Sequence, residues 1–257
     1  MSIATINGLN LYYELYGNSE ANETIVFMNG VMASTTSWAE QVQNFVKMGY
    51  NVLLHDFRVQ LKSDQPAGPY TFKLHAEDTI ALMRSLGIES AHLVGTSYGG
   101  EVSMRMAIDY PKRVKSLSII DSVSELDEVL RYFVSGWMSL AEIGNGELFF
   151  NGMLPSIYHE SYVKNNKTLL EKRAKAFNET PQSYFQGQIE LYKTFLGDVY
   201  MTNELFKINC PTIIICGQND ILKPVKFSEI LAKHIQGAEF VTIPDCGHVT
   251  IFEKPDA

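Results

Sequence analysis

The chain has 257 residues, of which 46% are hydrophobic and 19% charged, and its formal net charge is −8 at pH 7. This composition predicts one globular body with a large core, and it argues against electrostatic binding to nucleic acid or to an anionic membrane surface. The N-terminus has no basic region followed by a long apolar run, and no apolar stretch reaches membrane-spanning length, so we expect a cytoplasmic protein without a signal peptide. Cys210, Cys216 and Cys246 show no C-x-x-C spacing and are predicted to be reduced thiols.

Strands and helices alternate over roughly the first half of the chain. We predict strands at Gly8–Leu15, Thr24–Met28, Asn51–His55, Ala91–Val94 and Val114–Ile120, and helices near Trp38–Met48, Phe72–Leu86 and Tyr98–Tyr110. Such alternation is typical of a mostly parallel sheet covered by helices on both faces. The sequence therefore predicts the α/β fold class.

A G-x-S-x-G sequence, Gly95-Thr96-Ser97-Tyr98-Gly99, stands between a predicted strand and a predicted helix. A strand that turns abruptly into a helix holds its turn residue in a strained conformation, raises the serine oxygen above the sheet and aims the helix N-terminus at it. Glycine is needed on either side because a Cβ would clash across so tight a turn. Ser97 is therefore the candidate nucleophile, and a simple helix-capping serine is the alternative.

The strand pattern disappears between about Asp121 and Thr202. We interpret residues 122–202 as a helical cap inserted over the catalytic edge of a core formed by residues 1–121 and 203–257. The segment is rich in aromatic residues and methionine: Tyr132, Phe133, Trp137, Met138, Phe149, Phe150, Met153, Tyr158, Tyr162, Phe177, Tyr184, Phe185, Tyr192 and Phe195. Most of these are expected to form the core of the cap, and only a minority to touch substrate.

The strand pattern resumes at Thr212, and two polar residues follow the last two predicted strands. Asp220 comes just after Ile213–Cys216, and His248 comes just after Glu239–Ile243, with a helix predicted between about Pro224 and Ile235. One strand–helix–strand unit separates the two residues, so both loops should emerge at the same edge of a parallel sheet, close to Ser97. Asp220 could then orient the imidazole of His248.

With these motifs in the order serine, acid, histidine, the chain resembles an α/β-hydrolase. The resemblance covers nearly the whole length, from Gly8–Glu14 to Gly247–Pro255. It implies the α/β-hydrolase fold with Ser97, Asp220 and His248 as the catalytic residues. Asp121 and Glu125 remain alternative acids, because hydrolases with a displaced acid use about that region.

The resemblance also implies an oxyanion hole, which needs two backbone N–H groups. One should be the N–H of Tyr98, and the other that of Val31, in the turn Asn29–Ser34. Relatives usually carry His-Gly where this chain has Asn29-Gly30. The donor is a backbone group, so the change keeps it, and we expect Asn29 to organise the turn through its side-chain amide.

Two features depart from the family pattern. Within Asp56–Asp64, Val59 and Leu61 occupy positions where relatives have glycine, so a turn with positive φ would strain the β-branched Val59 and reshape one wall of the pocket. The chain also stops at Ala257, where relatives usually continue into a closing helix. We expect either that the sequence is truncated or that cover for the sheet comes from elsewhere.

The predicted function is that of a serine esterase or lactonase acting on a small apolar or aromatic ester-type substrate, through an acyl-enzyme on Ser97, with no cofactor and no metal. The remaining histidines lack H-E-x-x-H spacing and are expected to be structural: His55, His75, His92, His159 and His234. The physiological substrate and the oligomeric state stay open.

Two other functions remain alternatives. Asn29–Trp38 is similar to the corresponding turn of the rhamnolipid-pathway acyltransferase, which would favour coupling of hydroxyacyl chains from a thioester donor. Basic residues of the cap could then form a rim for an acyl carrier, although a solvated helix face is the preferred interpretation of them: Lys164, Lys167, Lys172, Arg173 and Lys175. The third possibility is a hydrolase relative that binds a ligand without turnover.

Overall fold

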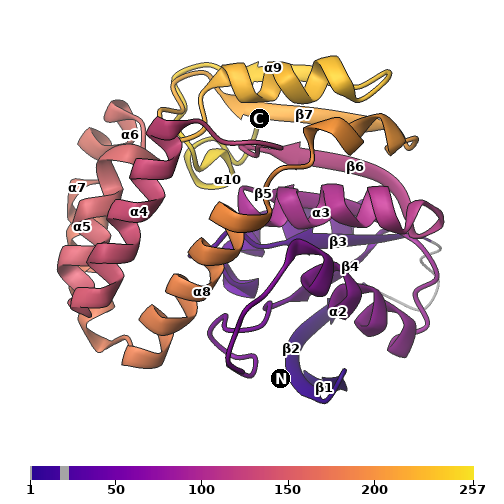
Figure 1. Cartoon of the computed structure of the whole chain (residues 1–257), viewed down its shortest axis with the longest axis horizontal. Coiled ribbons are helices and arrows are strands. Elements are labelled where there is room, and N and C mark those ends of the chain that lie inside the picture. The colour runs from indigo at the N-terminus through magenta and orange to yellow at the C-terminus, as the bar shows by residue number, and fades with distance from the viewer. Residues whose placement is uncertain (1, 18–22) are drawn as a thin grey trace.

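The computed structural model describes residues 2–17 and 23–257, which build an eight-stranded sheet in the order β1-β2-β4-β3-β5-β6-β7-β8 (Figure 1). The strands are β1 (Ser2–Ile6), β2 (Leu9–Tyr16), β3 (Thr24–Met28), β4 (Asn51–His55), β5 (Ala91–Thr96), β6 (Val114–Ile120), β7 (Thr212–Gly217) and β8 (Glu239–Ile243). β2 pairs antiparallel with β1 and β4, and all other neighbours are parallel. The predicted parallel sheet is confirmed, whereas β1 was not predicted.

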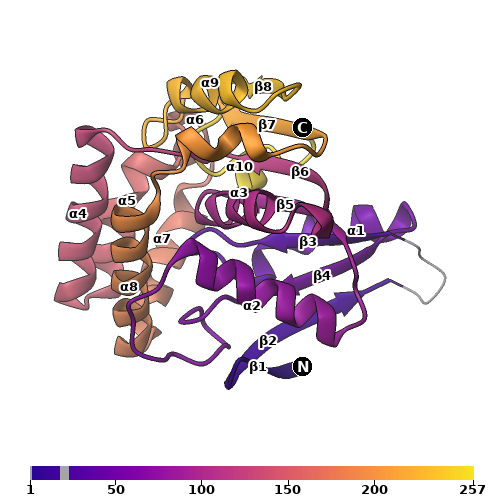
Figure 2. The same ribbon diagram turned by 45° about the vertical axis from the view of Figure 1, so that its right-hand side comes forward.

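Helices cover both faces of the sheet because successive strand residues point to opposite sides. In β3, Val26 and Met28 belong to the core shared with α2 (Phe72–Ser85), α3 (Tyr98–Asp109) and α9 (Val225–His234). Ile25 and Phe27 point the other way, toward α1 (Ala39–Lys47) and the short α10 (Thr250–Glu253) (Figure 2). Within the described part of the chain, no helix is both long and apolar enough to cross a membrane.

The α1 and α10 face is covered less completely at the β8 end of the sheet. Val241 of β8 is 41% exposed. Its register partner is Ile215 of β7, which packs against the cluster on the α1 and α10 side. The prediction of a mostly parallel sheet with helices on both faces is confirmed, and the edge strand β8 keeps Val241 partly exposed.

Between β6 and β7 the described residues form helices and no strand. The helices α4 (Glu128–Ile143), α5 (Gly146–Ile157), α6 (Glu160–Asn165), α7 (Lys167–Ala176) and α8 (Gln182–Asp198) stand at one end of the sheet (Figure 1). We call them the α4–α8 bundle. Capping sets its helix boundaries: the side chain of Asp127 accepts from the N–H of Leu130 to start α4, which ends at Gly144 with φ of 69°. The cap boundaries at 122 and 202 stay a prediction.

The three cysteines are free thiols, with Cys216 and Cys246 buried and Cys210 half-buried. Burial raises the pKa of each thiol. They act as small apolar side chains, as expected from their spacing.

Val59 adopts the strained conformation that its position predicts, with φ of 63°. The residue is only 2% exposed and packs against α8, where Gly187 makes room for it. A Cβ on Gly187 would lie 2.7 Å from the carbonyl oxygen of Val59 and 2.9 Å from its Cβ. Neither Val59 nor Leu61 lines the large cavity beside Ser97, so the expected change in a wall of the pocket is wrong.

The close approach of Val59 to α8 predicts that Gly187→Ala destabilises the protein by about 1–3 kcal/mol, because the added methyl group cannot fit without a backbone shift. Gly197→Ala is the matched control in the same helix, since its Cβ would meet no atom within 4 Å. It should be neutral or stabilising by up to about 1 kcal/mol through helix propensity. Urea unfolding of both variants measures the difference, and equal stabilities would contradict this packing.

Candidate active site

The turn between β5 and α3 holds Ser97 in an uncommon backbone conformation, with φ of 50° and ψ of −120°. Such a conformation costs about 1–3 kcal/mol and persists only where the surroundings impose it. The N–H of Ser97 donates to the carbonyl of Ile120 at 2.8 Å. A Cβ on Gly99 would lie 2.0 Å from the carbonyl oxygen of Met28 in β3. The packing of α3 against β3 therefore requires glycine at 99 and presents Ser97 at the carboxyl end of the sheet.

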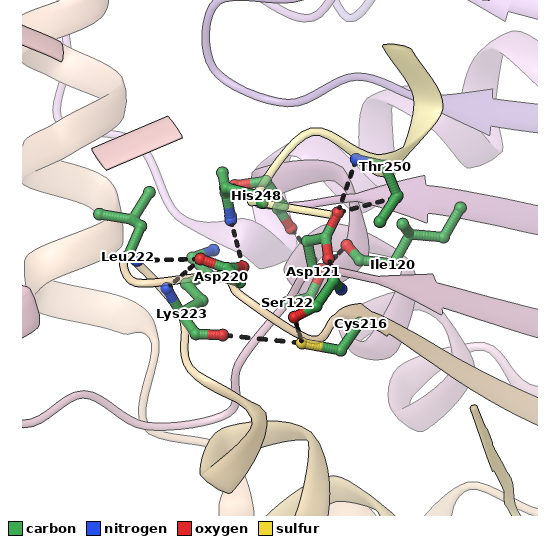
Figure 3. A network of polar contacts seen from close by, with 12 residues as sticks. Ile120, Asp121, Ser122, Cys216, Asp220, Leu222, Lys223, His248 and Thr250 are labelled. Atoms are coloured by element: carbon green, nitrogen blue, oxygen red, sulfur yellow. Dashed lines mark hydrogen bonds and ion pairs between the residues drawn. The ribbon is translucent and has the colours of Figure 1, made fainter. Parts of the chain in front are cut away.

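Ser97, His248 and Asp220 lie together in one hydrogen-bonded series, although they come from three separate loops. Nε2 of His248 lies 3.0 Å from Oγ of Ser97, and Nδ1 lies 2.7 Å from Oδ2 of Asp220. The other oxygen of Asp220 accepts from the N–H groups of Leu222 and Lys223 at 2.9 and 2.8 Å (Figure 3). The juxtaposition predicted from the spacing of the motifs is thus present in the fold.

The surroundings of His248 control both its charge and its tautomer. Burial lowers the pKa of the imidazole, but the Asp220 carboxylate beside Nδ1 outweighs this effect, and the pKa of His248 is raised overall. An ionised carboxylate only accepts hydrogen bonds, so the neutral imidazole carries its proton on Nδ1 and leaves Nε2 free to accept from the Ser97 hydroxyl. The arrangement can therefore take a proton from Ser97 and stabilise the imidazolium that results.

The loop that carries His248 is tied to the α4–α8 bundle. The N–H of His248 donates to the carbonyl of Ile157, the last residue of α5, at 2.7 Å. Glu253 of α10 accepts from the N–H groups of Gly247 and His159 at 3.2 Å each. The position of the imidazole consequently depends on how the bundle is seated on the sheet.

Asp121 and Glu125, the alternative acids, have other partners. Asp121 accepts from the N–H of Gly217 at 2.9 Å and from the hydroxyl of Thr250 at 2.8 Å (Figure 3). Burial, together with the nearby charge of Asp220, raises the pKa of Asp121 well above its ordinary value. Glu125 accepts from the hydroxyl of Thr202 at 2.6 Å. Asp121 joins β7 to α10 and so supports the loop of the histidine, a role that the sequence did not reveal.

Asp121, Cys216 and Asp220 form the one group of three potential metal ligands found close together among the described residues, with ligand atoms within 4.8 Å of one another. The Cys216 thiol already donates to the carbonyl of Gly217 at 3.4 Å and lies 3.9 Å from the carbonyl oxygen of Lys223. All four carboxylate oxygens already accept hydrogen bonds. The donor set does not fit a metal ion, and it contains none of the histidines expected to be structural.

Val31 and Tyr98, the expected oxyanion donors, flank Ser97. Tyr98 is the first residue of α3, where an N–H has no acceptor within the helix. Val31 lies in the turn after β3, and both residues line a small cavity together with Ser97. The two expected donors therefore lie beside the serine.

Buried amide side chains fix the turn that carries Val31. Asn29 donates to the carbonyl of His55 at 2.9 Å and accepts from the indole of Trp38 at 2.8 Å, as its expected organising role requires. Two further amides were not predicted. Gln60 donates to the carbonyl of Gly30 at 2.8 Å, and Gln188 of α8 donates to the carbonyl of Val31 at 3.0 Å.

A cavity of about 360 Å³ opens beside Ser97 and His248, between the Gly30–Ala33 turn and the α4–α8 bundle. Of the aromatic and methionine residues singled out in the sequence, those that line it are Trp137, Phe150, Met153, Tyr158 and Phe177. Others, such as Phe149 and Phe185, lie in the hydrophobic core. Contact of a minority of them with substrate stays a prediction, and the lining of this cavity is predominantly apolar.

The chain is similar over its length to α/β-hydrolases. A model of the alpha/beta hydrolase fold family matches residues 23–255. Among curated proteins, "Putative carbamate hydrolase RutD" of Caulobacter sp. (strain K31) is 25% identical over 261 residues, covering 100% of this chain and 95% of that protein. 3-Oxoadipate enol-lactonase 1 of Acinetobacter baylyi is 26% identical, covering 99% of this chain and 92% of that protein. The crystal structure of MGS-M2, an α/β-hydrolase enzyme from a Medee basin deep-sea metagenome library, superposes with a TM-score of 0.94 at 32% identity, covering 99% and 93% of the two chains.

Two fully buried histidines pack beneath the first turn of α3. The ring of His75 lies 5.6 Å from that of Tyr98 and 5.2 Å from that of Phe57, and the ring of His55 lies 5.0 Å from that of Phe57. Burial lowers the pKa of His75 to about 3 and that of His55 to about 4. Both rings are therefore neutral at pH 7 and serve as core side chains.

These depressed pKa values predict a loss of stability in mild acid. Between the folded and unfolded pKa values only the unfolded chain binds the proton, so the free energy of unfolding falls as pH drops below about 6.5, by about 2 kcal/mol per histidine at pH 5. In His75→Leu the loss between pH 7 and pH 5 should be smaller by about that amount. His234→Gln, which replaces an exposed histidine, is the control for loss of a histidine as such. Urea unfolding at the two pH values checks this, and parallel behaviour of wild type and His75→Leu would contradict it.

Proposed function

The chain belongs to the α/β-hydrolase fold family and is a hydrolase of that family, and from this premise we propose that it cleaves a carboxylic ester or lactone through an acyl-enzyme on Ser97. The observation that carries this proposal is the hydrogen-bonded series from Ser97 Oγ through His248 to Asp220. A serine beside a neutral imidazole oriented by a buried carboxylate is the arrangement that activates a hydroxyl for attack on an acyl carbon.

The reaction proceeds in two halves. Ser97 Oγ attacks the acyl carbon while His248 Nε2 takes its proton, and the carbonyl oxygen becomes an oxyanion that accepts from the N–H groups of Val31 and Tyr98. The tetrahedral intermediate collapses, the bond to the leaving oxygen breaks, and His248 delivers the proton to that oxygen. Water then attacks the acyl-enzyme with His248 again as base, which releases the acid and returns the proton to Ser97.

The relatives' names describe reactions of the same type. A carbamate hydrolase and an enol-lactonase each break a bond between an acyl carbon and a heteroatom leaving group. Carbamates, enol lactones and simple esters therefore form a sensible substrate panel for this chain. The apolar lining of the large cavity supports substrates with an apolar or aromatic part, and the α4–α8 bundle serves as the cap that encloses them.

Labelling with a fluorophosphonate tests the proposal. Intact mass should show one adduct, and peptide mapping should place it on Ser97 because only an activated serine reacts readily. Ser97→Ala should lose the adduct and at least about 10³-fold in kcat/KM on the best ester or lactone of the panel. Ser103→Ala, which removes another buried hydroxyl on α3, is the matched control and should still be labelled.

Three results would count against ester hydrolysis. Absence of the adduct on a folded chain would remove the activated serine. Labelling combined with transfer of an acyl group from a thioester to a hydroxyl acceptor, without hydrolysis of the panel, would favour an acyltransferase. Tight, persistent binding of an ester without turnover would favour a ligand-binding role.

One cation, Arg173 of α7, stands among the lining residues of the large cavity. Its Cζ lies 5.7 Å from the ring centroid of Phe252, and no described carboxylate is within ion-pair distance of it. The guanidinium can therefore bind a carboxylate on the leaving group of a substrate, since arginine forms charge-assisted hydrogen bonds with such groups.

Arg173→Met should lower kcat/KM for 3-acetoxybenzoate by about 3- to 10-fold relative to phenyl acetate, because the two esters differ in a leaving-group carboxylate and the cation is partly exposed. Lys172→Met is the matched control, since this exposed neighbour does not line the cavity. The ratio of the two rates is the readout. A ratio that falls equally in both variants would mean that general surface charge, rather than Arg173, selects the substrate.

A further inference from the structure

A second, much smaller cavity adjoins the same serine. It provides about 20 Å³, which is room for about one water-sized group. It shares Val31, Ser97 and Trp137 with the large cavity, so both spaces adjoin the serine. Its own walls include Glu101 from α3 and Lys223 from the loop after β7. Two charged side chains therefore line a recess that is otherwise largely apolar.

Glu101 and Lys223 form a buried ion pair with unused hydrogen-bonding capacity. Glu101 is 0% and Lys223 4% exposed. Oε1 of Glu101 accepts from Nζ of Lys223 at 2.8 Å and from the N–H of Val123 at 2.9 Å. Oε2 of Glu101 is buried and has no hydrogen-bond partner among the described residues. An ammonium has three N–H donors, and Glu101 takes one of them.

The ion pair favours a neutral ligand group that can both donate and accept a hydrogen bond. A carboxylate would be repelled by Glu101, and an ammonium by Lys223. A hydroxyl can donate to Oε2 of Glu101 and accept from Nζ of Lys223, so that it satisfies both. It also matches the size of the recess, which is too small for a carboxamide.

The recess faces the acyl side of the reacting bond. His248 lines the large cavity and is absent from the lining of the recess. Because His248 must protonate the leaving oxygen, the leaving group lies in the large cavity. The recess adjoins Val31 and Tyr98, the oxyanion donors, and is therefore open to the acyl group instead.

We propose that this recess is a hydroxyl subsite, in which a hydroxyl on the acyl part of the substrate donates to Glu101 and accepts from Lys223. The inference rests on the proposed ester hydrolysis at Ser97 and narrows its substrate class to hydroxyacyl esters or lactones. The buried ion pair is thereby a specificity element as well as a link between α3 and the loop after β7.

Paired ethyl esters test the subsite on the wild-type protein. The kcat/KM of ethyl lactate is compared with that of ethyl propionate, and that of ethyl 3-hydroxybutyrate with that of ethyl butyrate. Each value is divided by the rate constant for hydroxide-catalysed hydrolysis, which removes intrinsic reactivity. We expect at least about a 10-fold preference for the hydroxyl in one pair, the value of a hydrogen bond to a charged group. Absence of preference in both pairs would mean that the recess holds only an ordered water, and would overturn the proposal.

The double variant Glu101→Gln/Lys223→Met tests the residues themselves. Both charges are removed together because loss of one partner would leave the other charge buried and unpaired. The hydroxyl preference should fall to about 1, and because it is a ratio within one variant, a general loss of activity cancels. Arg105→Met/Glu204→Gln removes another ion pair of α3 that does not line the recess, and it should retain the preference.

Fluorophosphonate labelling distinguishes failure of the hydroxyl subsite from failure of the proposed ester hydrolysis. Labelling of Ser97 without hydroxyl preference overturns the subsite and leaves ester hydrolysis standing. Absence of labelling overturns the proposed hydrolysis itself. If the double variant does not fold, the wild-type ester pairs still decide the question.

Discussion

The hydrogen bond between Asp220 and His248 is the interaction on which the rest of the site depends. The two atoms lie 2.7 Å apart, and the side chains are 0% exposed for Asp220 and 6% for His248. A carboxylate this deeply buried needs further hydrogen-bond donors. The backbone N–H groups of Leu222 and Lys223, in the loop of Asp220 itself, supply them. Asp121 accepts hydrogen bonds from the backbone N–H groups of Gly217 in β7 and Thr250 in α10, and so links the two elements that flank the site. The loops at the carboxyl ends of β6, β7 and β8 thus cooperate to hold one carboxylate beside one imidazole.

The α4–α8 bundle lines the large cavity and also holds residues of the site in position through hydrogen bonds. Its residue Ile157 accepts the N–H of His248, and its residue Gln188 donates to the carbonyl of Val31. Movement of the bundle would therefore shift both the proposed base and a proposed oxyanion donor. Val59 also helps to fix the bundle on the sheet, because its strained backbone packs closely against Gly187 of α8. A departure from the family's glycine thus acts through packing of the bundle and not through the wall of the cavity.

Local patterns predicted the parallel strands, the helices that cover them and the convergence of Ser97, Asp220 and His248, because spacing and the rules of parallel topology fix where such loops emerge. Contacts between residues far apart in sequence could not be read in this way. Glu101 and Lys223 are separated by 122 positions, and nothing in either local sequence marks a buried pair. The Gln188 contact with the Val31 turn spans 157 positions. Asp121 was considered as an alternative acid because the sequence places it at the end of β6. Its hydrogen-bond partners, Gly217 and Thr250, are distant in sequence and could not be predicted.

The pH dependence of Ser97 modification by a fluorophosphonate tests the central claim most directly, because the rate depends on the neutral form of the base. The second-order rate constant should rise through a single ionisation above 6.5, the ordinary pKa of histidine, since Asp220 raises the pKa of His248. In Asp220→Asn this ionisation should move to lower pH and the plateau rate should fall. A rate that climbs steadily with hydroxide concentration, or an identical profile in Asp220→Asn, would contradict activation of Ser97 by the buried pair.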